Sequence, residues 1–422
     1  KIPMESFAAF YTLPALESLS LSTIYLIGDL PEGISKLKHL KSLDLAGTNI
    51  YSLPDDIGEL AENLTTLNLR GCQALASLGA NIGKLVNLKN LTLSGCKVLK
   101  ELPEGFGNLI QLTALDLSNC EWLERLSSDI GNLQVSTLTL RGCKLLKELP
   151  ESFGKLAKLT KLNFYDCAAL KSLPESIGDL TKVTEIDLSQ CTALTSLPAS
   201  LGQLTGLKKL TMPRTGLTTL PAAISSLSAL EELDVTGKEG TPGIRGVAAD
   251  VFSGLTKLKK LNASNNSFSG DLSWLKNLSA LQTLRLDGNQ LSGQLDLSQF
   301  SPNLTDVYLS NNKLEGNLNG ISTLTKVRNL YLEHNLLSGE LPAELGNCST
   351  LSYFYLSNNN ITGTIPVEVA KMNLGYSGLK LNGNRMSGEI PAEVLSSAVW
   401  KKLYPETNIY PQQEGYGFSN VK

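Results

Sequence analysis

The sequence of 422 residues has little of what metal centres and common catalytic sites require. Only two histidines are present, His39 and His334, and their positions in different halves of the chain exclude a multi-histidine metal centre and disfavour a Ser-His-Asp triad. No Cys-x-x-Cys pair and no complete phosphate-binding loop occur. We therefore expect a protein that is not an enzyme and that uses no cofactor or metal.

Long apolar runs and an excess of charge of one sign are missing as well. No stretch of about 20 apolar residues exists, so no segment is expected to span a membrane. The 37 basic and 40 acidic residues give a net charge of -3, which does not favour a nucleic acid or an anionic membrane surface as partner. Aromatic residues make up 6% of the chain, which fits an interior filled by leucine.

Apolar residues recur along almost the whole chain at nearly fixed steps. The stretch VRNLYLEHNLLSGELP at 327–342 shows them at offsets 0, 3, 5, 10 and 14. The pattern L-x-x-L-x-L-x-x-N-x-L is typical of leucine-rich repeats, whose units bury their apolar face only against their neighbours. We expect an α/β solenoid, a horseshoe or arc with one long parallel β-sheet on its concave face and short helical, 3₁₀ or extended segments on its convex face.

Sixteen repeats can be aligned on this pattern, and their subtype changes once. The step from Leu230 to Leu258 is 28 residues, whereas all others are 23 to 25. Earlier repeats read L-x-x-L-x-L-x-x-C-x-x-L-x-x-L-P, and later ones L-x-x-L-x-L-x-x-N-x-L-S-G-x-I/L-P. The repeats begin at Leu16, Leu40, Leu64, Leu88, Leu112, Val135, Leu159, Val183, Leu207, Leu230, Leu258, Leu281, Leu304, Val327, Leu351 and Tyr376.

The repeat boundaries predict five segments. Residues 1–15 are expected to be the remnant of an N-terminal cap, with a helix in Met4 to Leu13, and 16–237 to be Cys-type repeats. A longer junction loop should follow at 238–257, and Asn-type repeats at 258–390. Residues 391–422 should form a capping helix, Pro391 to Leu403, and a tail that folds back over the last repeat.

Offset 8 carries a cysteine in six successive Cys-type repeats and an asparagine in the six Asn-type repeats. We call these two series the cysteine ladder and the asparagine ladder. No partner motif accompanies the cysteines, so we expect buried free thiols rather than disulfides or a metal site. Reduced thiols favour a cytosolic or anaerobic setting over an oxidising one. The asparagine amides are expected to bond backbone groups of their own and the neighbouring turn. The ladders are Cys72, Cys96, Cys120, Cys143, Cys167 and Cys191, then Asn266, Asn289, Asn312, Asn335, Asn359 and Asn384.

Three family resemblances follow from these motifs. The Cys rungs and the L-P-E-S-I-G-x-L motif resemble the repeats of plant intracellular immune receptors, and N-x-L-S-G-x-I-P resembles those of plant receptor kinases. The closing motif LNGNRMSGEIP at 381–391, with Trp400 and IYPQQEGYGF at 409–418, is similar to the end of exported leucine-rich-repeat proteins of anaerobic gut bacteria. The last resemblance implies a secreted or cell-surface bacterial binding protein that contacts a host. The first implies a cytosolic immune-type sensor.

Offset 4 of each repeat should face the concave surface, because side chains alternate along a strand. Up to Asn262 this column is small, polar and acidic, whereas later repeats carry tyrosines between two basic residues. Clustered tyrosines are typical of recognition surfaces, but neighbouring tyrosines also pack on one another as ordinary cross-strand pairs, so both interpretations stay open. The candidate ligand-binding residues are Arg285, Tyr308, Tyr331, Tyr353, Tyr355 and Lys380, with Asp306, Glu333, Asp287 and His334 at the rim.

The other charged columns give less indication of a binding or catalytic site. Offset 2 alternates in sign over five repeats, which predicts ion pairs between neighbouring strands; its members are Lys161, Glu185, Lys209, Glu232 and Lys260. The acidic residues of offset 4 lie at least two repeats apart, roughly 10 Å or more, which excludes a catalytic carboxylate pair. Calcium binding at these positions has only weak support.

We thus expect a non-enzymatic recognition module, monomeric, that binds a protein or a glycan on its concave face. The alternative is a structural or adhesive surface spacer without a discrete ligand. An extended sheet suits a macromolecule better than a small molecule.

Overall fold

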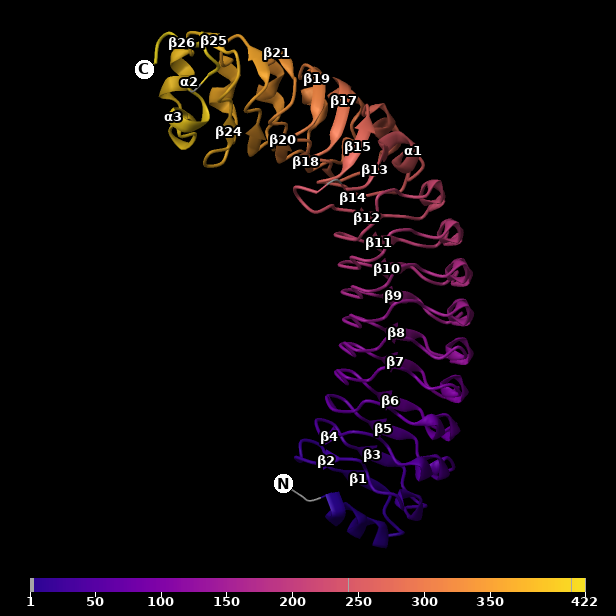
Figure 1. Cartoon of the computed structure of the whole chain (residues 1–422). Coiled ribbons are helices and arrows are strands. Elements are labelled where there is room, and N and C mark those ends of the chain that lie inside the picture. Colours follow the sequence, from indigo (N-terminus) through magenta and orange to yellow (C-terminus); the bar gives the residue numbers. More distant parts are fainter. Residues whose placement is uncertain (1–3, 242, 411, 422) are drawn as a thin grey trace. The chain divides into compact units, whose positions relative to one another are not determined.

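The computed structural model describes residues 4–241, 243–410 and 412–421 and divides the chain into two compact units, Lys1–Leu217 and Thr218–Lys422. We call them the N-terminal and the C-terminal unit. Within each unit successive repeats form the turns of a solenoid, and each turn places a short strand and a short helical segment at different sides (Figure 1). Every helix in the described ranges is too short or too polar to cross the hydrocarbon core of a membrane.

The sheet strands lie where the repeat pattern predicts them. Each begins two residues after an expected repeat start, except β24, and carries a buried apolar residue in its centre or, in β24, at its start. In the N-terminal unit they are β1 (Ser18–Ser20), β3 (Ser42–Asp44), β5 (Thr66–Asn68), β6 (Asn90–Thr92), β7 (Ala114–Asp116), β8 (Thr137–Thr139), β9 (Lys161–Asn163), β10 (Glu185–Asp187) and β11 (Lys209–Thr211). In the C-terminal unit they are β12 (Glu232–Asp234), β14 (Lys260–Asn262), β16 (Thr283–Arg285), β18 (Asp306–Tyr308), β20 (Asn329–Tyr331), β22 (Tyr353–Tyr355) and β24 (Leu379–Lys380).

Neighbouring strands within a unit pair in parallel and in equal register, as between Leu43 and Leu67 or between Leu330 and Phe354. The predicted leucine-rich-repeat solenoid with a parallel sheet is therefore confirmed. Equal register also stacks residues of equal offset into columns, and this places the candidate site.

Short helices return the chain to the next strand, and most are 3₁₀-helices. In the N-terminal unit they are η1 (Met4–Thr12), η2 (Ile34–Lys36), η3 (Asp55–Leu60), η4 (Ala80–Lys84), η5 (Phe106–Asn108), η6 (Ile130–Asn132), η7 (Glu151–Lys155), η8 (Glu175–Asp179) and η9 (Ala199–Gln203). In the C-terminal unit they are η10 (Ala222–Ser226), α1 (Ala248–Phe252), η11 (Ser273–Asn277), η12 (Leu297–Gln299), η13 (Ile321–Thr323), η14 (Ala343–Asn347), η15 (Val367–Lys371), α2 (Ala392–Ser396), η16 (Trp400–Lys402) and α3 (Pro405–Asn408).

The glycine of the I-G-x-L motif has a packing reason. A Cβ on Gly131 would overlap the carbonyl oxygen of Ser152 in the next repeat, and a Cβ on Gly154 would overlap that of Ser176. Glycine thus lets successive 3₁₀-helices approach closely.

Additional short strands lie beside the main sheets. The N-terminal unit has β2 (Ile27–Gly28) and β4 (Asn49–Ile50). In the C-terminal unit further short strands form one four-stranded parallel sheet, β13 to β19, and two parallel pairs, β21 with β23 and β25 with β26. They are β13 (Arg245–Val247), β15 (Ser267–Gly270), β17 (Gln290–Leu295), β19 (Lys313–Gly316), β21 (Ser338–Glu340), β23 (Asn360–Thr362), β25 (Ser387–Gly388) and β26 (Gly417–Phe418). Residues 238–257, expected to bulge as a loop, thus contain β13 and α1.

The two ladders are buried and hydrogen-bonded. All six cysteines of the ladder are free thiols, and each Sγ donates to a carbonyl oxygen of the preceding repeat at 3.1–3.3 Å. Burial raises the pKa of Cys120 and Cys191 to about 12. Each asparagine Nδ2 donates to a carbonyl oxygen of its own turn and to one of the preceding turn; for Asn312 these are Leu309 and Leu286. Its Oδ1 accepts from the backbone N–H of Leu291.

The ends of the chain are covered by short segments. Phe7 and Tyr11 of η1 are buried, and the Tyr11 hydroxyl donates to the carbonyl oxygen of Pro31. At the other end the tail returns as expected, because Gly417 and Phe418 pair with Ser387 and Gly388.

The prediction of a single capping helix from Pro391 to Leu403 is wrong. Helix α2 ends at Ser396, because Ser397 adopts an extended conformation, and the chain continues through η16 and α3. Val394 and Trp400 are buried, but Val399 is not, so the assumed apolar stripe does not form.

A second correction concerns the last repeat. Tyr376, expected at a buried repeat start, has an exposed fraction of 69%. Leu374, two residues earlier, is buried and lies in the interior.

Candidate binding face of the C-terminal unit

A straight column of five long side chains crosses the sheet of the C-terminal unit. Parallel register pairs Arg285 with Tyr308, Tyr308 with Tyr331, Tyr331 with Tyr355, and Tyr355 with Lys380. The strands β16, β18, β20, β22 and β24 thus supply one residue each. We call this set the tyrosine column. It brings together five of the residues predicted from the sequence.

The three rings of the tyrosine column pack on one another. The centroids of Tyr308 and Tyr331 are 4.7 Å apart with an interplanar angle of 44°, and those of Tyr331 and Tyr355 are 4.6 Å apart at 53°. These distances match the strand spacing of a sheet, about 4.8 Å. Aromatic pairs at such tilts attract each other, so the column is a preorganised surface.

A cation closes each end of the tyrosine column. The Arg285 Cζ atom lies 4.3 Å from the ring centroid of Tyr308, and the Lys380 Nζ atom lies 4.2 Å from that of Tyr355. Both distances fall in the range of cation–π attraction. Along the column each ring therefore has a ring or a cation next to it on both sides.

The hydroxyls of Tyr331 and Tyr355 remain protonated donors at neutral pH. Partial burial raises the pKa of Tyr331 to about 12, and the neighbouring rings of Tyr355 and Tyr308 and the carboxylate of Glu333 add to the shift. Burial, followed by Glu333 and Tyr353, also raises the pKa of Tyr355. Within the described ranges no hydroxyl of the column has a hydrogen-bond partner. These groups are thus available to a ligand.

The carboxylates beside the column already accept protein hydrogen bonds. Asp306 accepts from Asn329 Nδ2 at 2.5 Å and from the Thr305 hydroxyl at 2.7 Å. Glu333 accepts from the Ser310 hydroxyl at 2.5 Å. Asp306 and Glu333 are thus held in place as the rim of the surface.

Three further predicted residues border the column. The ring of Tyr353 lies edge-on to Tyr355, with centroids 6.3 Å apart. Asp287 accepts from the Ser264 hydroxyl at 2.6 Å, and His334 Nε2 lies 3.2 Å from Asn358 Nδ2.

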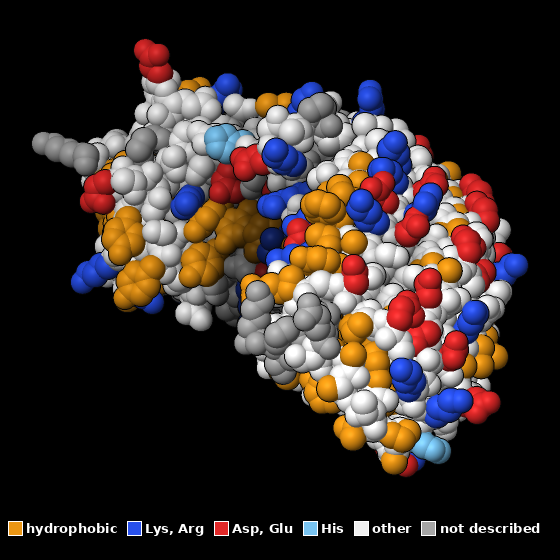
Figure 2. All heavy atoms as spheres, turned by 60° about the horizontal axis from the view of Figure 1, so that its bottom comes forward, with side chains coloured by type: hydrophobic (Ala, Val, Ile, Leu, Met, Phe, Trp, Pro, Cys, Tyr) orange, Lys and Arg blue, Asp and Glu red, His pale blue; other side chains and the backbone are white. Residues whose placement is uncertain are grey.

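The same column of the N-terminal unit has a different character. Asp116 accepts from the backbone N–H of Ser118, and Asp187 from that of Ser189, so these carboxylates cap local turns. On the neighbouring column Lys161 forms an ion pair with Glu185 at 2.9 Å. Figure 2 shows acidic and basic side chains interspersed over the surface turned toward the viewer.

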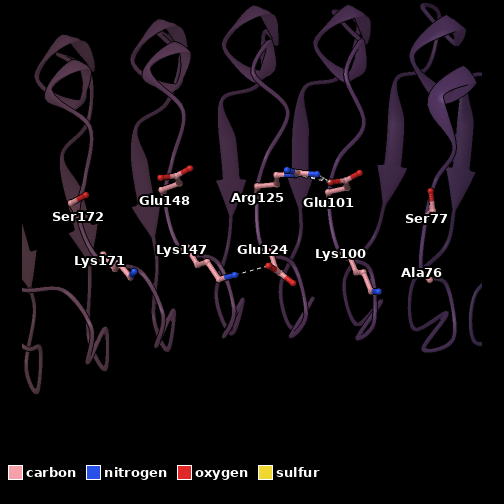
Figure 3. Close-up of a pocket in the computed structure, with 10 residues that line it drawn as sticks. All are labelled: Ala76, Ser77, Lys100, Glu101, Glu124, Arg125, Lys147, Glu148, Lys171 and Ser172. Atoms are coloured by element: carbon pink, nitrogen blue, oxygen red, sulfur yellow. Dashed lines mark hydrogen bonds and ion pairs between the residues drawn. The ribbon is translucent and has the colours of Figure 1, made fainter.

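A groove on the flank of the N-terminal unit was missed by the sequence interpretation. It has a volume of about 770 Å³ and is lined by offsets 12 and 13 of five consecutive repeats, where charges alternate (Figure 3). Lys147 pairs with Glu124 at 2.6 Å, and Arg125 pairs with Glu101. The groove has no aromatic side chain to anchor a partner. Its residues are Ala76, Ser77, Lys100, Glu101, Glu124, Arg125, Lys147, Glu148, Lys171 and Ser172.

Comparisons with known proteins agree with this fold. The family profile "Leucine-rich repeat region" matches residues 107–210 and 165–315, and the profile "Leucine Rich Repeat" matches 87–109, 326–348 and 350–372. A solved structure of a leucine-rich-repeat protein of Leptospira interrogans is 29% identical, with a TM-score of 0.65, and the match covers 96% of this chain and 99% of that one.

Two further similar proteins come from a curated set and from solved structures. TMV resistance protein N of Nicotiana glutinosa is 46% identical over 67 residues, which are 16% of this chain and only 6% of that protein. The crystal structure of a TDR receptor has a TM-score of 0.66 at 24% identity, covering 97% of this chain and 74% of that one. At this identity the likeness concerns the fold alone.

Proposed function

Because this chain belongs to the leucine-rich-repeat proteins, we propose that it is a recognition protein that holds an extended protein segment against the sheet of its C-terminal unit. The tyrosine column is the observation that supports this proposal. It offers rigid rings and unpartnered hydroxyls in a row, and tyrosine of this kind is enriched in binding hot spots. Non-enzymatic binding, rather than catalysis, is the activity proposed.

Ring geometry favours a protein segment over a glycan. A sugar that stacks on an aromatic residue needs an open ring face, whereas each ring of the tyrosine column has a neighbouring ring, Arg285 or Lys380 next to it on both sides. The remaining hydroxyl groups suit backbone carbonyl oxygens, which an extended segment presents along its length.

A bacterial cell-surface or secreted location is also part of the proposal. It is supported by the resemblance of the C-terminal motif to exported proteins of gut bacteria and by the full-length likeness to a bacterial leucine-rich-repeat protein. Protease accessibility on intact cells tests it: protection from added protease would favour the cytosolic alternative.

A phage-displayed peptide library tests the binding surface. Clones selected on the wild-type protein should lose most of their binding to a double variant, Tyr331→Ala with Tyr355→Ala. Tyr165→Ala is the matched control, because Tyr165 also lies under a cation, Arg141 at 4.8 Å, but in the N-terminal unit. Undiminished binding to a folded double variant would refute the site, and failure to select any clone would favour the spacer alternative.

A further inference from the structure

We infer that the tyrosine column selects an acidic peptide segment whose two carboxylates lie six residues apart, with uncharged residues between them. This inference rests on the proposed function and narrows its ligand. It is based on which hydrogen-bond donors of the column have no protein partner, which neighbouring acceptors already have one, and where the charged side chains lie along the column.

Among the described residues, the two cations of the column have no ion-pair partner. Neither Arg285 nor Lys380 forms an ion pair or a side-chain hydrogen bond within the described part of the chain. Lys260, on the same sheet of the same unit, pairs with Glu232 at 2.9 Å. Each end of the tyrosine column therefore carries a cation that forms no ion pair with a described residue, and a ligand carboxylate can pair with it there.

The face around the tyrosine column offers mainly hydrogen-bond donors to a ligand. The carboxylates of Asp306 and Glu333 accept hydroxyl and amide groups of the protein itself, and Asp287 does the same. The hydroxyls of the three tyrosines and the two cations remain. A complementary ligand must therefore supply acceptors, which carboxylates and backbone carbonyl groups do.

The length of the column sets the spacing of the carboxylates. Adding the four consecutive distances from Arg285 Cζ through the ring centroids to Lys380 Nζ gives about 18 Å. Residues six apart point to the same side of an extended strand about 20 Å apart, and to the same side of a polyproline II helix about 19 Å apart. Residues four apart in a strand reach only about 13 Å.

The centre of the column disfavours a ligand with continuous negative charge. Glu333 lies close enough to Tyr331 and Tyr355 to raise the pKa of both. Asp306 stands two residues before Tyr308 on β18 and so borders the column on the same face of the sheet. A polyanion such as an oligouronate would place carboxylates beside these two groups. A segment with acidic ends and a neutral middle avoids this repulsion.

Calorimetric titration of the whole chain with acetylated, amidated heptapeptides tests the inference. One peptide has aspartate at its first and last positions and uncharged residues between them; the second has asparagine there; the third has its two aspartates three residues apart. The first should bind about tenfold more tightly than the others, and added salt should weaken it. Arg285→Gln with Lys380→Gln should remove this advantage, whereas Lys276→Gln, an exposed cation on η11, should not.

Other outcomes would overturn the inference in distinct ways. Equal binding of the aspartate and asparagine peptides would remove the charge selection but leave the proposed function intact. Equal binding of the two aspartate peptides would remove the spacing. Tighter binding of a galacturonic acid tetramer would replace the peptide by a polyanionic sugar. If no heptapeptide binds, the inference fails, and the display experiment judges the proposed function separately.

Discussion

Within each unit, the ladder side chain at offset 8 of a repeat bonds to the preceding repeat. This side chain is a cysteine in the N-terminal unit and an asparagine in the C-terminal unit. In the N-terminal unit the Cys120 thiol donates one hydrogen bond, to the carbonyl oxygen of Leu93 at 3.3 Å. In the C-terminal unit the Asn312 amide donates to the carbonyl oxygens of Leu286 and Leu309 and accepts from the N–H of Leu291. A thiol is a small, nearly apolar group, whereas an amide has strong donors and an acceptor.

This difference affects the path of the chain. From Asn289 onward, the Oδ1 of each ladder asparagine accepts from the backbone N–H two residues after the preceding ladder asparagine, and the segment around this N–H forms a strand, as in β15 and β17. Cysteine has no comparable acceptor, and the segment after it forms a turn. The stability of the C-terminal unit should therefore depend more strongly on each asparagine of its ladder. The stability of the N-terminal unit should be more sensitive to ionisation of its thiols.

Alkaline pH should have the largest effect, and mainly on the N-terminal unit. Burial raises the thiol pKa, to about 12 for Cys120 and Cys191, so the folded state keeps protons that the unfolded chain loses. This stabilisation is complete below the unfolded pKa, about 8.5, and is lost as pH rises toward the folded value. Each thiol should lower the free energy of unfolding by about 1.4 kcal/mol per pH unit, and six thiols by several kcal/mol.

Urea unfolding at increasing pH, followed by hydrogen exchange in each unit, measures this effect. The double variant Cys120→Ala with Cys143→Ala removes two of the six thiols and should reduce the pH slope of the N-terminal unit by about a third. An unchanged slope would show that other groups cause the alkaline loss.

Removal of one asparagine rung should have the next largest effect. Asn312→Ala removes three buried hydrogen bonds and leaves the N–H of Leu291 without its side-chain partner, which should cost about 3 kcal/mol of unfolding free energy. The carbonyl oxygens of Leu286 and Leu309 keep the hydrogen bonds that Asn289 and Asn335 donate. Cys120→Ala, the matched change in the other ladder, removes one weak bond and should cost about 1 kcal/mol. Equal losses by denaturant unfolding would refute the contrast between the ladders.

The repeat pattern was sufficient to predict the columns, because parallel register aligns residues of equal offset. Arg285 and Lys380 could thus be placed at opposite ends of three tyrosines from spacing alone. The packing of the rings could not be predicted, since it depends on the tilt that each ring adopts against its neighbour. The broken C-terminal helix was missed because spacing does not show that Ser397 becomes extended and that Trp400 fills the interior.

The smallest effect should be found where the sheet face carries paired charges. Lys161 and Glu185 are 2.9 Å apart, but their side chains are 63% and 44% exposed, so water screens their attraction. A double-mutant cycle with Lys161→Gln and Glu185→Gln should give a coupling below about 1 kcal/mol in urea unfolding. Arg285→Gln should likewise leave stability nearly unchanged, yet it should weaken binding of the acidic peptide, because its charge has no partner within the described residues. A large coupling for the first pair would mean that the charged columns stabilise the solenoid, and an unpaired Arg285 would then no longer be evidence of a ligand.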